Sequence, residues 1–102
     1  MIQVLRWTGV DGARNLLRME RHWHWEARNE TRNIARSYRL SIATDLFGWS
    51  IVEQHWGRIG SAGRSRRIAF ERPEAAQRHV RTVIARRASA PRRIGAAYLE
   101  IE

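Results

Sequence analysis

The chain has 102 residues, the length of one domain, and 43% of them are apolar, with five tryptophans. This composition excludes a disordered tail. No apolar run approaches the roughly 18 residues that a membrane helix needs, and the first residues do not read as a signal peptide. Because cysteine is absent, disulfides and thiolate metal sites are excluded, and we expect a cytoplasmic protein.

The net charge of +9 is concentrated in one part of the chain, and all 19 basic residues are arginines. Between positions 56 and 93, eleven arginines stand against two glutamates, whereas the rest of the chain is balanced. A field of one sign attracts a polyanion, so the charge favours nucleic-acid binding. The alternatives are that the arginines keep a small domain soluble, or that they reflect a coding bias toward arginine.

Alternation of apolar and polar residues predicts strands in the first part of the chain. Residues 2–7 alternate weakly, residues 10–13 carry an Asp-Gly turn signal, and residues 17–25 place their tryptophans on one face. The two alternating segments are expected to form a hairpin. Residues 26–36 are polar and are expected to form a loop.

The central segments predict three more strands joined by short turns. Residues 37–44 alternate again, and a turn at residues 45–48 leads into residues 49–58, which are rich in tryptophan, isoleucine and valine. Two glycines within residues 59–63 predict a hairpin loop. Residues 64–70 form the expected return strand.

The period of the apolar residues changes after Pro73, a residue that suits the first turn of a helix. Apolar residues recur on one side and arginines mostly on the other, which predicts an amphipathic helix that ends near Ala88. Residues 97–101 predict a short last strand. The expected fold class is α+β, a small antiparallel β-sheet with one helix packed on a face, in a single domain over residues 1–102.

The stretch HWGRIGSAGRSRR, residues 55–67, combines a large ring with a guanidinium. In a strand, Trp56 and Arg58 point to the same face, and Gly57 between them leaves the backbone bare. The ring can stack on a base, the guanidinium can hold a phosphate, and the bare glycine lets a ligand approach. The alternative is that Trp56 belongs to the core, with Arg58 at its edge and the glycines only making the turn.

The run YRLSIATDLFGWSIVEQHWGRIGSAGRS, residues 38–65, resembles the WGR domain, which is named after its Trp-Gly-Arg motif. The similar features are a Tyr-x-Leu strand, an aromatic residue (Trp49) opening the next strand, the Trp-Gly-Arg-Ile-Gly sequence that closes it, and the helix and strand that follow. The lead-in NIAR, residues 33–36, is similar to that of small bacterial members. The resemblance runs from about Asn15 to the end and leaves residues 1–14 outside as an extra segment.

The resemblance implies an antiparallel sheet with one helix and a stand-alone DNA-binding module that is not an enzyme. In the poly(ADP-ribose) polymerases, WGR domains bind DNA near strand breaks. There the motif tryptophan packs against the terminal nucleotide, and the motif arginine helps relay binding to neighbouring domains. By this resemblance Trp56 would contact a nucleotide, and Arg58 a phosphate or a partner protein. Arg36 stands where those enzymes often place a basic residue against the DNA backbone, and Asn33 is a candidate for the same reason.

A second candidate site, for a metal ion, lies on the first long predicted strand. His22, His24 and Glu26 alternate along one strand face. Adjacent strand positions seldom converge on a tetrahedral ion by themselves, and neighbouring Trp23 and Trp25 favour an ordinary half-buried strand. No metal, cofactor or catalytic residue is expected.

The predicted nucleic-acid-binding site consists of the motif, its lead-in and nearby arginines, namely Trp56, Gly57, Arg58, Arg36, Asn33, Arg39, Arg64 and Arg66. Binding to DNA ends, nicks or backbone would be largely independent of sequence and steeply dependent on salt. The choice between DNA and RNA and the oligomeric state are left open by the sequence. The alternative function is a protein–protein interaction module that docks an acidic partner.

Overall fold

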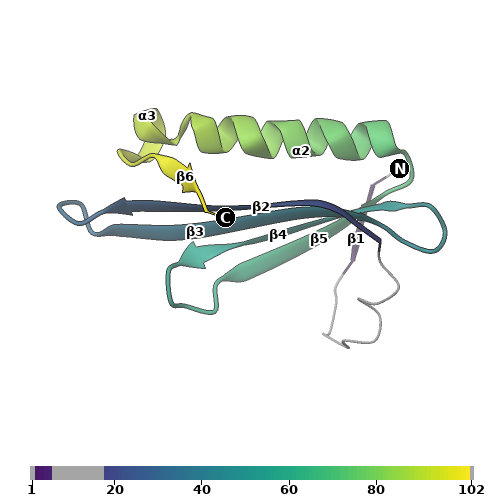
Figure 1. Ribbon diagram of the computed structural model, residues 1–102, viewed down its shortest axis with the longest axis horizontal. Helices are drawn as coiled ribbons and strands as arrows, with labels where there is room; N and C mark the ends of the chain where they lie inside the picture. The colour runs from purple at the N-terminus through teal and green to yellow at the C-terminus, as the bar shows by residue number, and fades with distance from the viewer. Residues whose placement is uncertain (1, 6–17, 102) are drawn as a thin grey trace.

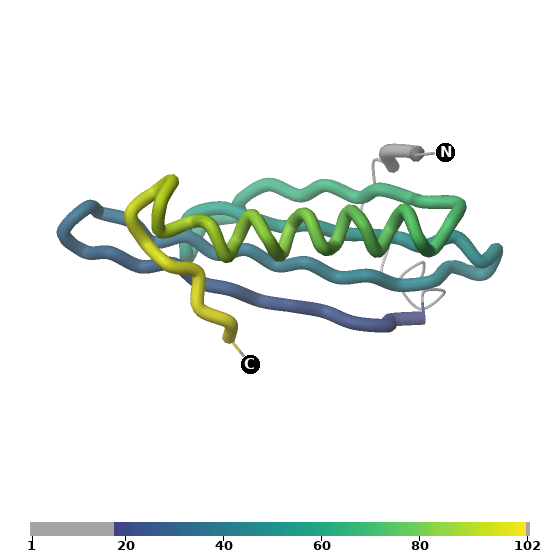
Figure 2. Tube along the Cα trace, turned by 90° about the horizontal axis from the view of Figure 1, so that it is seen from above, coloured from purple at the N-terminus to yellow at the C-terminus, as the bar shows by residue number. Residues whose placement is uncertain are grey.

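The computed structural model describes residues 2–5 and 18–101. The elements are β1 (Ile2–Leu5), β2 (Arg18–Asn29), β3 (Ile34–Thr44), β4 (Ser50–Arg58), β5 (Arg64–Phe70), α2 (Pro73–Ala88), α3 (Ala90–Ile94) and β6 (Tyr98–Glu100). The strands form one sheet in the order β1-β5-β4-β3-β2-β6, with every neighbouring pair antiparallel. Helix α2 lies along one face of this sheet (Figures 1 and 2). The predicted α+β fold class is confirmed.

The predicted hairpin between residues 2–7 and 17–25 is wrong. All four residues of β1 pair with β5, so β1 and β2 lie on opposite sides of the central strands. The predicted turn at residues 10–13 lies outside the described residues. A weakly alternating segment can be recognised as a strand, but its partner is decided by which strand edge offers free backbone groups.

The predicted loop over residues 26–36 is much shorter in the structure. Strand β2 continues to Asn29 and β3 begins at Ile34, so the turn is confined to residues 30–33. Asn33 completes this turn with a positive φ of 53°. The tip of the hairpin projects past the helices (Figure 1).

The elements predicted from residue 37 onward agree with the structure to within about three residues at each end. The β5 strand and α2 have the expected bounds, and Ala76, Val80 and Val83 form the buried stripe of the helix. Helix α3 was not expected, because the sequence around Pro91 was interpreted as the end of helical structure. Pro91 instead occupies the first turn of this short helix, where it needs no N–H partner.

The hydrophobic core lies between α2 and the sheet face that α2 covers. Alternate residues of β2 to β5 point into it, and the sheet contributes Trp23, Trp25, Tyr38, Leu40, Ile42, Val52, Ile68 and Phe70. Trp23 and Trp25 stack with ring centroids 6.5 Å apart, so these tryptophans belong to the core. Leu40, Val52 and Ile68 are the largest fully buried side chains.

We expect Leu40→Ala to lower the free energy of unfolding by about 3 kcal/mol, because it leaves a cavity among large neighbours. Leu40 is 1% exposed, whereas Leu99 is 66% exposed. The control Leu99→Ala should therefore change the free energy of unfolding by less than about 0.5 kcal/mol. Urea unfolding of both variants measures the difference. Equal losses would contradict the assignment of the core to the helix-covered face.

Candidate nucleic-acid interface

Trp56 lies at the border of the core. The strand register places it directly opposite Tyr38, which in turn lies opposite Trp25. The rings of Tyr38 and Trp56 are nearly parallel, at 18°, with centroids 6.0 Å apart. Trp56 is half-buried and packs against the core cluster. The ring therefore joins the core and remains partly open to solvent.

Arg58 and Asn33, two of the predicted site residues, contact each other. The Nη1 and Nη2 atoms of Arg58 donate hydrogen bonds to the backbone oxygen and the Oδ1 of Asn33, at 3.2 and 3.0 Å. These bonds tie the end of β4 to the β2–β3 turn. A guanidinium has five N–H donors, so the two bonds orient Arg58 and leave donors for a phosphate.

Gly57 has a packing role in this structure. A Cβ on Gly57 would lie 2.7 Å from the Cα of Gly63, in the loop between β4 and β5. A Cβ on Gly63 would collide with the carbonyl oxygen of Trp56. The loop therefore folds closely against the end of β4, and the space that Gly57 leaves is filled by the chain itself rather than offered to a ligand.

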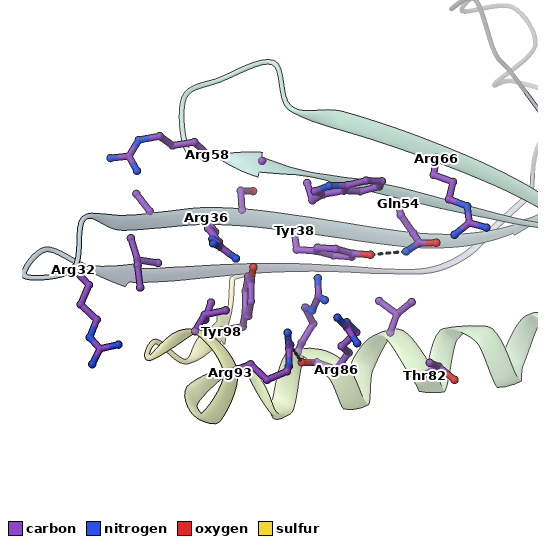
Figure 3. Close-up of a pocket in the computed structure, with 18 of the residues that line it drawn as sticks. Arg32, Arg36, Tyr38, Gln54, Arg58, Arg66, Thr82, Arg86, Arg93 and Tyr98 are labelled. Atoms are coloured by element: carbon purple, nitrogen blue, oxygen red, sulfur yellow. Dashed lines mark hydrogen bonds between the residues drawn. The ribbon is translucent and has the colours of Figure 1, made fainter.

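A groove of about 810 Å³ lies between α2 and the sheet, at the end that carries the motif (Figure 3). Its lining includes no aspartate or glutamate among the described residues. Tyr38, Trp56 and Tyr98 supply its aromatic surfaces. Its positive charges are Arg32, Arg36, Arg58, Arg66, Arg86, Arg87 and Arg93. A concave surface with charges of one sign concentrates the field and attracts anions.

Arg87 carries its charge into the interior of the groove. Its guanidinium carbon lies 3.8 Å from the centroid of the Tyr38 ring and 5.1 Å from that of Tyr98. Burial lowers the pKa of Arg87 from its usual value, and the two tyrosines oppose this shift. An arginine still remains protonated in a protein. Among the described residues, no hydrogen-bond partner faces its buried Nε. The groove therefore holds a fixed cation directly above the Tyr38 ring.

The structure brings most of the predicted site residues together. The predicted residues that line the groove are Trp56, Gly57, Arg58, Arg36, Asn33 and Arg66. Arg64 lies opposite Trp56 on β5 but outside the groove lining. Arg39 lies between the buried Tyr38 and Leu40, and therefore faces the other side of the sheet.

Sequence reasoning missed four arginines of the groove, Arg32, Arg86, Arg87 and Arg93. Arg32 lies in the predicted loop. The sequence leaves two interpretations open for Arg86 and Arg87, a solvated helix face or a wider electrostatic footprint, and places neither residue in the site. One signal was available for Arg87, because Val80, Val83 and Arg87 follow one another at spacings of three and four. These spacings continue the buried stripe of the helix.

The candidate metal ligands on β2 do not form a site. Within residues 2–5 and 18–101, no group of three histidine, aspartate or glutamate side chains is arranged to hold a metal ion. The Nε2 of His24 lies 3.2 Å from the Oγ of Ser37 and 4.0 Å from the Oε2 of Glu26. In the described part of the chain, no helix is both long and apolar enough to cross a membrane.

A family model, the WGR domain, matches residues 21–90. The chain belongs to the WGR domain family. The match extends from β2 to the start of α3, and thus includes the long helix and the central strands of the groove but not Arg93 or Tyr98. This confirms the resemblance seen in the sequence and places the chain in a family of nucleic-acid-binding modules. Comparisons with curated proteins and with solved structures give no match.

The WGR loop offers a test of its close packing. Gly60 and Gly63 have positive φ values of 88° and 67°, so alanine at either position costs about 1–2 kcal/mol for the left-handed backbone. A Cβ meets nothing within 4 Å at Gly60, whereas at Gly63 it meets the Trp56 carbonyl. We expect Gly63→Ala to reduce the free energy of unfolding clearly more than Gly60→Ala. Equal losses in urea unfolding would show that the loop does not press on β4.

Proposed function

We propose that this WGR domain is a non-enzymatic module that binds DNA in the groove between α2 and the sheet, largely without sequence specificity. The observation that carries the proposal is a groove with seven arginines, three aromatic rings and no carboxylate in its described lining. Phosphates are the anions that such a density of guanidinium groups fits, since arginine binds them in a fork. The family match supports the nucleic-acid part of this proposal.

The positions of the arginines give the groove an unbalanced charge. Arg36 and Arg58 lie directly opposite each other on β3 and β4, and like charges in this arrangement destabilise a sheet. Arg86 and Arg87 face them from α2 across the groove. A phosphate backbone relieves this repulsion on binding. Because each neutralised phosphate releases counterions, affinity should fall steeply with salt.

The size of the groove favours DNA ends and unpaired strands. A volume of about 810 Å³ is that of a pocket for a small ligand, so a terminal nucleotide or a short single strand can enter and a duplex cannot. Trp56 is half-buried and supported by Tyr38 at 6.0 Å, which gives a fixed ring for a base or sugar. Stacking on such a ring contributes about 1–3 kcal/mol and does not depend strongly on the base.

Two arginines of β3 provide a matched test of the groove. Arg36 lines it, whereas Arg39 lies on the opposite face of the same strand. We expect Arg36→Ala to weaken DNA binding several-fold and to reduce the slope of log affinity against log salt by about 0.9. Arg39→Ala should leave both unchanged. Fluorescence anisotropy with blunt, nicked and single-stranded DNA at several salt concentrations measures these quantities.

The same titrations separate this function from its competitors. Equal effects of Arg36→Ala and Arg39→Ala would show that the groove is not the interface. Tighter binding of a matched RNA would make RNA the ligand. The absence of nucleic-acid binding, together with saturable binding of an acidic peptide, would replace the proposal with a protein-docking function.

A further inference from the structure

A chain of hydrogen bonds connects the helix to the aromatic floor of the groove. The Nε2 of His79 on α2 lies 2.8 Å from the Oε1 of Gln54 on β4, and the Nε2 of Gln54 donates to the hydroxyl of Tyr38 on β3 (Figure 3). Gln54 is only 8% exposed, so these bonds hold the imidazole in place. The ring of Phe70 also lies against it, with centroids 5.5 Å apart.

This arrangement determines which ring nitrogen of neutral His79 carries the hydrogen. An amide oxygen only accepts hydrogen bonds, so Nε2 carries the hydrogen and Nδ1 holds the lone pair. Protonation of the ring converts Nδ1 into a second donor without disturbing the bond to Gln54. His79 lines the groove, whose arginines attract anions.

The permanent cation nearest to His79 in the groove is Arg66. Arg66 is opposite Gln54 in the β4–β5 register and also lines the groove. Within the described residues, its guanidinium makes neither a hydrogen bond nor an ion pair. The groups facing His79 are Arg66 and Phe70 from β5, Gln54 from β4 and, beyond Gln54, the hydroxyl of Tyr38.

Charge and burial together oppose protonation of His79 in the free protein. Burial first, and then the charge of Arg66, lower the pKa of His79 below its ordinary value of 6.5. Along α2 the further charged groups in the groove are also cationic, and no carboxylate lines it among the described residues. At neutral pH the imidazole is therefore mainly uncharged until an anion arrives.

We propose that Arg66 and His79 form a phosphate subsite of the groove, and that a phosphate bound there is accompanied by uptake of one proton on Nδ1 of His79. The proton comes from solvent, and the hydrogen on Nε2 of His79 remains there, donated to Oε1 of Gln54. Gln54 is two residues, or about 7 Å, from Trp56 along β4, so the subsite lies beyond the motif. That the phosphate belongs to a nucleic acid rests on the proposed function.

The proposal gives nucleic-acid affinity a defined dependence on pH. A bound phosphate offsets the charge of Arg66 and raises the pKa of His79, so the complex holds the proton at a higher pH than the free protein. Affinity therefore rises as pH falls through the pKa of the complex, and levels off below the pKa of the free protein. Over this pH range the affinity increases in total about tenfold for each unit by which binding raises the pKa of His79.

The experiment measures the affinity of the full chain for a single-stranded oligothymidylate between pH 5.5 and 8.0 at constant ionic strength. His79→Gln keeps an amide donor for Gln54 but cannot take up a proton, so its affinity should not change with pH. The control His22→Gln alters an exposed histidine on the uncovered face of β2 and should retain the wild-type profile. Arg66→Gln should raise the pKa of free His79 and weaken binding.

Calorimetry in two buffers of different ionisation enthalpy measures the number of protons taken up on binding. We expect up to one proton for the wild type and none for His79→Gln.

The outcomes distinguish this inference from the proposed function. If DNA binds but His79→Gln keeps the wild-type pH profile, the subsite is wrong and the DNA-binding function stands. If no nucleic acid binds, NMR titration of His79 with and without inorganic phosphate tests the phosphate subsite by itself. An upward shift of its pKa that is absent in Arg66→Gln supports a site for free phosphate, and no shift overturns the subsite.

Discussion

The register of β3 against β4 is the constraint on which the groove depends. It places Tyr38 opposite Trp56 and Arg36 opposite Arg58, so the aromatic floor and the first pair of cations come from the same two strands. Alternation fixes this register, because a slip of one residue would turn the apolar side chains away from α2. The turn between the strands supports it through Asp45, whose Oδ1 accepts hydrogen bonds from two backbone N–H groups at 2.9 Å.

Arginines on the two sides of the sheet have different kinds of partners. On the face away from α2, Arg67 pairs with Glu53 and Arg28 with Glu26. On the groove side, arginines are held by neutral partners. Arg58 bonds to the Asn33 amide oxygen, Arg93 to the hydroxyl of Ser89 at 3.1 Å, and Arg87 lies against tyrosine rings. A neutral partner orders a guanidinium without cancelling its charge, so the groove stays both structured and electropositive.

Local patterns predicted much of this fold but only part of the site. Alternation and turn chemistry located the central strands, and the change of period at Pro73 located the helix. The partner of β1 could not be predicted, because pairing of an edge strand depends on the assembled sheet. The position of Arg87 in the groove could not be predicted for a related reason. Two tyrosine rings that are distant in sequence make its partly buried position favourable.

The wall of the groove formed by Arg93 and Tyr98 follows the long helix in the chain and is held by a short strand. Strand β6 pairs with β2 over three residues, and the amide of Ile101 adds a bond to the carbonyl of His24 at 2.7 Å. With so few hydrogen bonds, this edge segment is expected to open easily. Any ligand that touches Tyr98 and the central strands at once would clamp β6 in place. Occupancy of the groove would then appear as slower hydrogen exchange at the β6 edge, which β3 and β2 separate from the strand that carries the Trp-Gly-Arg motif.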